Sequence, residues 1–514
     1  MWVLAATILV SGMAALLGRS VSLALPAIQS SLHADITGIQ WVINSFGLIM
    51  AVFILIGGSL GDHFGRKRIL GYGIAIFVVG CVLSALSRNI GQLIAAQCVI
   101  GVGAVMTLPA CLSIINVSFL ESEKGRAIGL WAGFGAAFGV AGFLLGGLII
   151  QTLGWRTIFS VNIPIGIFAL FVTLKFVPES RSPDAKHIDW LGTLWLALGL
   201  LGISYALIYS PLRGMKNLPV IGSIAGGAAS VILFLFWQRR AASPLVPLHL
   251  FRSSVIVRAN LVTFFLYFAL NGVYVFVVVY FQQQFRYSPT VAGAAMLPAS
   301  LLVALFSGRS GALTDRIGPR IPMAIGAALT ALGVALFMIP GVQVNYFTAF
   351  LPAVMVLGFS MVVFVAPLTK AALAVDPKYS GVASGVNNGI ARISGLFAIA
   401  VLGAVMAFVF THQLHRQLPS SGLTTEQQSQ ILQQANRVGG LEVPSTFDSR
   451  ATDTARNIVQ ASLLQSFRWA MGISAAVAAL AALSALLFVR RGGWQATNGR
   501  ERFEGAPSVA PRDR

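Results

Sequence analysis

The chain is dominated by apolar runs that are long enough to cross a lipid bilayer. A bilayer core about 30 Å thick is crossed by roughly 20 helical residues, and backbone groups in lipid must find their hydrogen-bond partners within the segment. These runs are too long and too uniformly apolar for the alternating strands of a membrane barrel. The sequence predicts fourteen spans, at residues 2–25, 40–60, 69–87, 92–117, 127–150, 157–177, 190–210, 219–237, 259–281, 289–311, 321–340, 346–372, 382–410 and 466–489. The predicted fold class is an all-α polytopic membrane protein.

Composition and charge support this prediction. Only 10% of the residues are charged, whereas soluble domains carry about 25%, so a water-soluble globular protein is excluded. A net charge of +19 would suggest nucleic-acid binding in a soluble protein, but cytoplasmic loops of membrane proteins also collect Lys and Arg. With a cytoplasmic N-terminus, the short inside loops hold fourteen Lys and Arg and the short outside loops five. We therefore expect a multi-pass protein of the plasma (inner) membrane, surrounded by lipids, with both termini cytoplasmic and no nucleic-acid partner.

The residues that could support catalysis or metal binding show no suitable pattern. Cys81, Cys98 and Cys111 lie in apolar spans without metal-ligand spacing, and we interpret them as small core residues. The sequence also lacks a Ser/His/Asp set and a phosphate-binding loop. We therefore predict no enzyme activity, no cofactor and no metal.

One loop motif occurs twice. Gly58, Asp62 and Gly65 follow the second span, and Gly311, Asp315 and Gly318 follow the tenth with the same spacing. Each loop joins the second and third helices of a six-helix set, which indicates a parallel repeat of the kind found in secondary transporters.

The repeat divides the chain into four parts. Two six-helix halves flank a linker that carries two inserted membrane helices, and a polar tail follows the last span. A polar outside loop at 411–465 holds two helix-like stretches, 424–437 and 451–465. The predicted parts are 1–178 for the first half, 179–258 for the linker, 259–490 for the second half and 491–514 for a disordered cytoplasmic tail.

The repeated loop has a physical logic. The glycines permit a tight turn between two membrane helices, and Asp62 can cap or complement the positive N-terminus of the following helix. The cations that follow anchor that end at the anionic cytoplasmic leaflet. The predicted conformational-motif residues are Gly58, Asp62, Gly65, Arg66 and Lys67 in the first loop, and Asp315, Arg316, Gly318 and Arg320 in the second.

These loops, together with matching pieces along residues 1 to 490, resemble the major facilitator superfamily. The pieces include Ala24-Leu25-Pro26, Gln40-Trp41 and Asp189-Trp190. Fourteen spans place the resemblance near the EmrB/QacA-like drug:H+ antiporter branch. The resemblance implies the major-facilitator fold, with two six-helix halves plus two inserted helices, and export of drugs by alternating access. It also implies a monomer, and some relatives work with a periplasmic adaptor protein, which the 411–465 loop could meet.

Three coupling elements of that branch are altered. Leu17 stands at the place of the Asp in the first span, Gln97 at that of the Arg in the fourth, and Phe143 at that of a proline in the fifth. All sixteen acids and all six histidines fall in loops, at helix ends or in the tail. Because proton-coupled transporters usually carry protons on acids or histidines inside the membrane, conventional proton coupling is doubtful.

Cations do lie inside the predicted spans. Arg19 and Arg392 would give a positively biased cavity suited to an organic anion or a zwitterion, since a deep Arg needs water or a partner. Arg19 could instead snorkel outward, Arg392 could pack with hydrogen bonds to neighbouring carbonyls, and each amide could equally bond a neighbouring helix. The candidate cavity residues are Arg19, Asn44, Gln97, Trp131, Tyr267, Asn271, Tyr274, Asn387, Asn388 and Arg392.

Three function classes follow. The leading hypothesis is a secondary active transporter that exports amphipathic small molecules or drugs by alternating access. A facilitator or exporter of organic anions without conventional proton coupling is one alternative, and a non-transporting membrane receptor or scaffold is another.

Overall fold

The structure is a computed structural model in which the described residues are 2–181, 188–246, 248, 251, 253–303, 305–306, 318–341, 344–372, 380–435, 438, 441, 443–444 and 446–488. Throughout these residues the regular secondary structure is helical. The predicted all-α membrane class is therefore confirmed.

We call the elements from α1 to α7 the first half and those from α10 to α18 the second half, following the predicted division. The elements of the first half are α1 (Trp2–Ser31), α2 (Ile36–Phe64), α3 (Arg66–Leu86), α4 (Ile90–Ser118), α5 (Glu121–Leu153), α6 (Thr157–Ser160) and α7 (Asn162–Phe176). The inserted pair is α8 (Trp190–Arg213) and α9 (Leu218–Gln238). The second half contains α10 (Ser254–Gln284), α11 (Pro289–Ala294), α13 (Arg320–Leu336), α14 (Tyr346–Ala349), α15 (Leu351–Ala372), α16 (Ser380–Gln417), the 3-10 turn η3 (Leu418–Ser420), α17 (Thr425–Leu432) and α18 (Ser449–Phe488).

Among the described residues, eleven helices are long and apolar enough to cross a membrane. Three shorter apolar helices, Ala137–Leu153, Pro289–Val303 and Arg320–Leu336, occupy the places of predicted spans. The chain is thus a multi-pass membrane protein, whereas the number of fourteen crossings stays a prediction.

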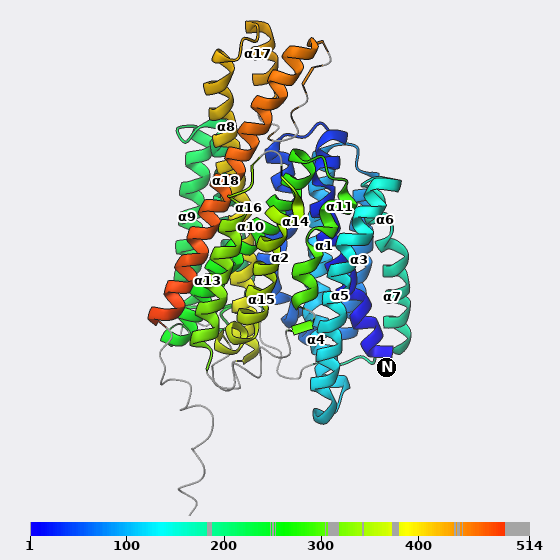
Figure 1. Ribbon diagram of the computed structural model, residues 1–514. Coiled ribbons are helices and arrows are strands. Elements are labelled where there is room, and N and C mark those ends of the chain that lie inside the picture. Colours follow the sequence, from blue (N-terminus) through cyan, green and yellow to red (C-terminus); the bar gives the residue numbers. More distant parts are fainter. Residues whose placement is uncertain are drawn as a thin grey trace, which may run out of the picture.

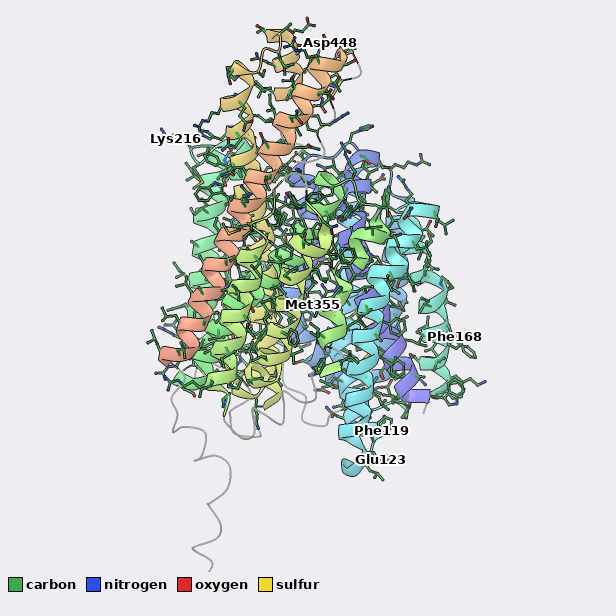
Figure 2. The ribbon with its side chains drawn as sticks, viewed as in Figure 1. Phe119, Glu123, Phe168, Lys216, Met355 and Asp448 are labelled. Carbon is green, nitrogen blue, oxygen red and sulfur yellow. The ribbon has the colours of Figure 1, made fainter. Side chains whose placement is uncertain are left out.

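The helices form one bundle whose two ends differ (Figure 1). Helix α1 begins at one end, which also carries the Asp62 loop; we call it the motif end. Helix α17 lies at the other, which we call the hairpin end. Lys216 and Asp448 lie toward the hairpin end and Glu123 at the motif end, while Phe168 points outward from the flank with 52% of its surface exposed (Figure 2). Charged groups at the ends and apolar side chains on the flank fit a bilayer around the bundle.

The two halves meet along two seams. Helix α2 packs against α16, and α5 packs against α11. The inserted pair covers the first seam, because α8 contacts both α2 and α16. An apolar cluster joins these elements, and its buried members are Ala51, Val52, Leu196, Leu200, Phe234 and Leu396.

The segment 411–465 differs in detail from the prediction. The first helix-like stretch is the short α17, which begins with a capping box between Thr424 and Gln427. The second stretch, predicted at 451–465, is not a separate helix, because α18 runs without interruption from Ser449 to Phe488. Helix α16 also continues past the predicted end at 410 to Gln417. Two long helices therefore project beyond the bundle at the hairpin end (Figure 1).

The acids of the described residues lie at helix ends, in connections or in the projecting segment. Asp35 and Asp189 illustrate the reason: each accepts a hydrogen bond from a first-turn backbone N–H and so caps α2 or α8. The others are Asp62, Glu121, Glu123, Glu179, Glu426, Asp448 and Asp453. In the part of the chain that the structure describes, the membrane-spanning interior therefore holds cations without carboxylates.

Candidate functional site

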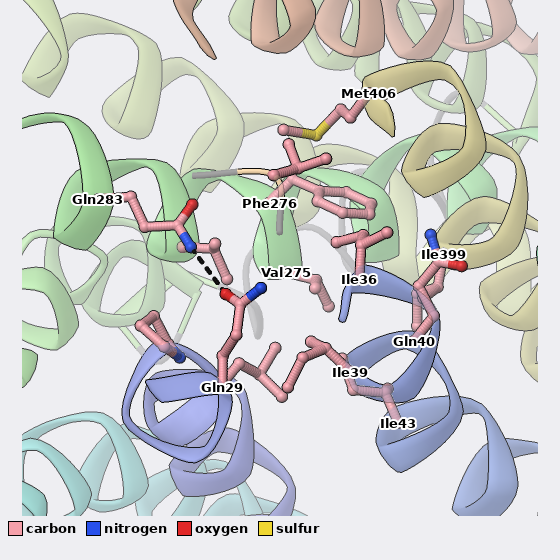
Figure 3. A pocket seen from close by; sticks show the side chains of 14 residues that line it. Gln29, Ile36, Ile39, Gln40, Ile43, Val275, Phe276, Gln283, Ile399 and Met406 are labelled. Atoms are coloured by element: carbon pink, nitrogen blue, oxygen red, sulfur yellow. Dashed lines mark hydrogen bonds between the residues drawn. The ribbon is translucent and has the colours of Figure 1, made fainter. Parts of the chain in front are cut away.

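At the hairpin end, side-chain hydrogen bonds join the two halves. The Gln282 amide donates to the Leu23 carbonyl at 2.9 Å, and the Gln283 amide donates to Gln29 Oε1 at 3.2 Å (Figure 3). Each of these bonds connects α10 in the second half with α1 in the first. The bundle is therefore closed at this end, and we call this contact region the gate.

The gate leaves almost no free space. It surrounds a cavity of about 30 Å³ whose walls come mainly from α1, α2, α10 and α16 (Figure 3). That volume admits about one water molecule and no organic substrate. The Gln29 Nε2 and Gln40 Oε1 atoms are buried here without hydrogen-bond partners among the described residues. A buried amide without a partner raises the free energy of the closed contact, because it has lost its hydrogen bonds to water. Opening the gate would restore those bonds and is therefore less costly.

One face of α5 contacts the second half near the hairpin end and loses that contact toward the motif end. At the hairpin side, a Cβ added to Gly147 would lie 2.5 Å from Thr290 Cα of the second half. A Cβ added to Gly293 of the second half would crowd the carbonyl of Phe143, four residues before Gly147. Gly139 and Gly135 continue this face, and a Cβ at either would meet none of the described residues within 4 Å. On the α5 side the halves therefore touch near the gate and lose contact at Gly139 and Gly135, whereas the seam between α2 and α16 stays packed.

Arg19 lies just below the gate and contacts both halves. Its guanidinium is 5.3 Å from the ring centroid of Phe143 on α5 and 4.7 Å from that of Tyr274 on α10. The Tyr274 hydroxyl donates to the Met361 sulfur at 3.1 Å. The predicted cation and one of the predicted aromatic walls are thus brought together, and Arg19 engages rings of the interior.

Arg392 supplies a second cation on α16. It is partly buried, interacts electrostatically with Tyr267 of α10, and has a buried Nε without a hydrogen-bond partner among the described residues. Asn388, one turn earlier, is exposed.

Two predicted amides bond neighbouring groups. The Asn387 amide donates to Asn260 Oδ1 at 3.0 Å and to Thr263 Oγ1 at 2.7 Å, joining α16 to α10. The Asn271 amide donates to the carbonyl of Tyr267 at 2.8 Å in its own helix. Asn387 therefore joins two helices of the second half, whereas the Asn271 bond stays within α10.

The remaining predicted residues lie within the first half. The Trp131 indole donates to Ser11 Oγ at 2.7 Å and so joins α5 to α1. Asn44 is fully buried with both amide atoms unpartnered among the described residues, and Gln97 is buried with its Nε2 unpartnered. Asn44 and Gln97 are not open to the space between the halves in this state.

The first motif loop is ordered by two ion pairs, one of which holds Asp62 beside the first residue of α3. Asp62 accepts from Arg66 Nη2 at 2.7 Å and Nε at 3.0 Å, so it pairs with Arg66 and does not cap α3. Glu179 takes that place, since its carboxylate accepts from the Lys67 backbone N–H at 3.1 Å and pairs with Arg68 at 3.6 Å.

The glycines of the motif also divide in role. Gly65 alone forms the turn, with φ at +104° between α2 and α3, a region that favours glycine. Gly58, predicted as a turn residue, lies inside α2 because the helix continues to Phe64. In the second loop, Gly318 has φ at +76° and Arg320 Nε donates to the Leu486 carbonyl of α18 at 3.0 Å. Asp315 and Arg316 lie outside the described residues.

The sequence prediction missed the gate itself. Its glutamines stand at helix ends, where polar side chains are ordinary, and only the run Gln282-Gln283-Gln284 at the end of an apolar span marks the place. Glu179 was missed for a related reason, because it follows α7 and reaches the motif loop only in space.

These features are typical of one class: a membrane transporter built from two helical halves that are joined at one end and lose contact along α5 toward the other. A sequence profile described as Major Facilitator Superfamily matches residues 7–399. The chain therefore belongs to the major facilitator superfamily, and it is a transporter and not an enzyme.

Known relatives and solved structures agree with this assignment. The chain is 33% identical to "Multidrug resistance protein Stp" of Mycobacterium tuberculosis over 75% of this chain and 72% of that protein. It is 29% identical to the "Tetracenomycin C resistance and export protein" of Streptomyces glaucescens over 93% and 89%. The fold is similar to that of a bacterial homolog of the human lysosomal transporter Spinster, with a TM-score of 0.63, 16% identity and coverage of 94% and 97%.

Proposed function

We propose that the chain exports amphipathic small molecules by alternating access and that the structure is its state open toward the cytoplasm. The observation that carries the proposal is the α5 face, on which Gly147 touches the second half while Gly139 and Gly135 do not. A substrate would enter the space between the halves from the motif end and leave when the gate opens.

The direction of transport rests on charge and on the relatives. The positive-inside rule assigns the motif end to the cytoplasm, which also places both termini there. Two relatives carry names of drug resistance and export, so we propose drug-like compounds as the substrates of this chain. We propose a monomer; the adaptor protein predicted for the 411–465 loop stays a prediction.

The charge of the space between the halves favours anionic substrates. Arg19 and Arg392 lie on its walls, and the described membrane interior holds no carboxylate to offset them. The two guanidiniums would repel a cationic drug. They would form charge-assisted hydrogen bonds with the acidic group of an anionic one. We therefore propose organic acids and neutral amphiphiles over cations.

The same distribution of acids supports transport without conventional proton antiport. The test is flux of anionic, neutral and cationic dansyl compounds from proteoliposomes, with and without a pH gradient. We expect the anionic compound to move fastest and its flux to persist when the gradient is collapsed. Uphill flux that stops with the gradient would overturn the coupling proposal, and saturable flux of none of the compounds would favour the receptor or scaffold alternative.

A further inference from the structure

A second cavity lies on the outer side of the gate. Its volume is about 350 Å³, within the range of about 300–1,000 Å³ typical of small-molecule sites. It is bounded by the end of α10, the chain near Leu441 and Val443, and the projecting part of α18. We call this cavity the vestibule.

The gate separates the vestibule from the rest of the pathway. Gln283 lines both the vestibule and the small gate cavity, and it donates to Gln29 across the closed contact. A molecule that passes the opened gate would therefore enter the vestibule next. The cavity exists because α18 continues past the bundle, so the segment that distinguishes the hairpin end also builds this site.

The exposed lining of the vestibule is mainly polar. Arg286 and Arg456 are the charged residues among those that line it, and Thr452 and Gln460 add polar groups. Leu441 and Leu463 also line it but are buried, with 4% and 2% of their surfaces exposed. The lining therefore suits the acidic group of a ligand, which would gain charge-assisted contacts with the guanidiniums.

Among the described residues, the acid paired with Arg456 is Asp453, and it offsets that charge only weakly. Asp453 lies 3.7 Å from Arg456, but 73% of its side chain is exposed, where an ion pair is weak. Arg286 has a positive φ of 55°, a conformation that costs energy for a residue other than glycine. Such positions are concentrated at functional sites, and this one places a guanidinium at the mouth of the gate.

We propose that the vestibule is an exit subsite that binds the acidic group of an organic anion leaving the gate. This rests on the proposed export function and extends it to the outer face. An anionic lipid headgroup offers the same chemistry, so the test separates the two sources.

The experiment measures binding of dansyl-phenylalanine, and of the neutral dansyl-phenylalaninamide, to the full chain in phosphatidylcholine nanodiscs. Wild type should bind the acid at two sites. Arg286→Asn combined with Arg456→Gln should weaken one of them by about tenfold or more, because charged hydrogen bonds are lost, and leave the amide unchanged. Asn is chosen at 286 because it tolerates positive φ, and Arg456→Gln alone, on an exposed helix face, should weaken the same site if the double variant does not fold.

Arg450→Gln is the matched control, since Arg450 is an exposed arginine of the same helix that does not line the vestibule; it should keep both sites. Glu442, outside the described residues, stands between two lining positions in sequence, and Glu442→Gln should not weaken binding of the acid. Unchanged binding of the acid in the double variant would overturn the subsite. An equal loss of binding for the acid and the amide in the double variant would also overturn the subsite.

Two further arms separate the remaining explanations. Adding phosphatidylglycerol to the nanodiscs should leave the apparent Kd of the vestibule unchanged, and a rise would assign the site to lipid headgroups and overturn its role for exported anions. Flux of the same probes from proteoliposomes tests export itself. Absent flux with intact vestibule binding would contradict the proposed function and leave the binding site standing.

Discussion

The guanidinium of Arg19 lies 4.7 Å from the ring centroid of Tyr274, and the two residues belong to opposite halves of the transporter. The contact is just below the gate formed by Gln283 and Gln29. The Arg19–Tyr274 contact therefore has two roles. It places a cation between the two halves, and it stabilises the closed gate.

Removing the ring of Tyr274 should loosen the gate. A cation–π contact contributes about 0.5–2 kcal/mol, so Tyr274→Leu should raise the open population about 2- to 30-fold. The measurement is maleimide labelling of Val279→Cys, a residue of the gate cavity, after replacement of Cys81, Cys98 and Cys111 by alanine. Tyr274→Phe keeps the ring and should label like the parent. Identical labelling of the Leu and parent forms would refute this role.

Closing the gate should require glycine at 147 and not at 139. An added methyl at Gly147 would lie 2.5 Å from the Thr290 backbone, whereas at Gly139 it would meet none of the described residues within 4 Å. Overpacking of this kind costs about 1–3 kcal/mol, which would reduce the closed population about 5- to 150-fold. Gly147→Ala should therefore raise Val279→Cys labelling and depress flux. Gly139→Ala lies on the same face and should do neither, and equal effects of both would argue against this gate.

The sequence predicts the helices well because lipid imposes a strong constraint on each one separately. A run such as 92–117 must be apolar over its whole length, and α4 covers it from Ile90 to Ser118. Helix ends outside the membrane are less constrained. A polar stretch in water can either continue a helix or end it, so polarity alone does not mark the end. For that reason the stretch at 451–465 was separated from the last span, although α18 contains both.

The candidate site was harder to predict, because the role of a buried polar residue depends on its partner. Nothing in the sequence distinguishes Asn387, whose amide joins two helices, from Asn44, whose amide has no partner among the described residues. Arg19 and Arg392 were easier to place, since a membrane-embedded cation needs a special environment wherever it lies. The gate glutamines show the limit: their pairing joins positions 254 residues apart.

The turn of the first motif loop should depend on Gly65 and not on Gly61. Gly65 has φ at +104°, and a Cβ there would also lie 2.7 Å from Glu179 Oε1. Gly65→Ala should therefore destabilise the protein by about 1–3 kcal/mol. Gly61 lies inside α2 with ordinary contacts at 3.6 Å, and Gly61→Ala should be neutral or stabilising by about 0.5–1 kcal/mol. Thermal unfolding in one detergent compares the two, and equal losses would disprove the assignment.

The Asp62–Arg66 pair should affect the transport cycle more than substrate binding. The pair lies at the motif end, on the loop between α2 and α3, where side chains from both helices meet. Asp62→Asn removes the ion pair and leaves the side-chain shape, so flux should fall while the Kd of dansyl-phenylalanine stays at the parent value. Arg450→Gln, on the opposite end of the bundle, controls for loss of surface charge. Equal binding and equal turnover in Asp62→Asn would contradict this role.

Asn387 and Arg392 lie close together on α16 but should respond differently to substitution. Asn387 bonds Asn260 and Thr263, so Asn387→Ala should destabilise the wall by about 0.6–1.7 kcal/mol per interaction and reduce flux of anionic and neutral probes alike. Arg392 has a buried Nε without a partner among the described residues, and we expect the acidic group of a substrate to supply that partner. Arg392→Gln should reduce flux of dansyl-phenylalanine selectively and leave that of dansyl-phenylalaninamide near the parent value. A parallel loss of both probes in Arg392→Gln would make it a second wall residue and remove the basis for anion preference on α16.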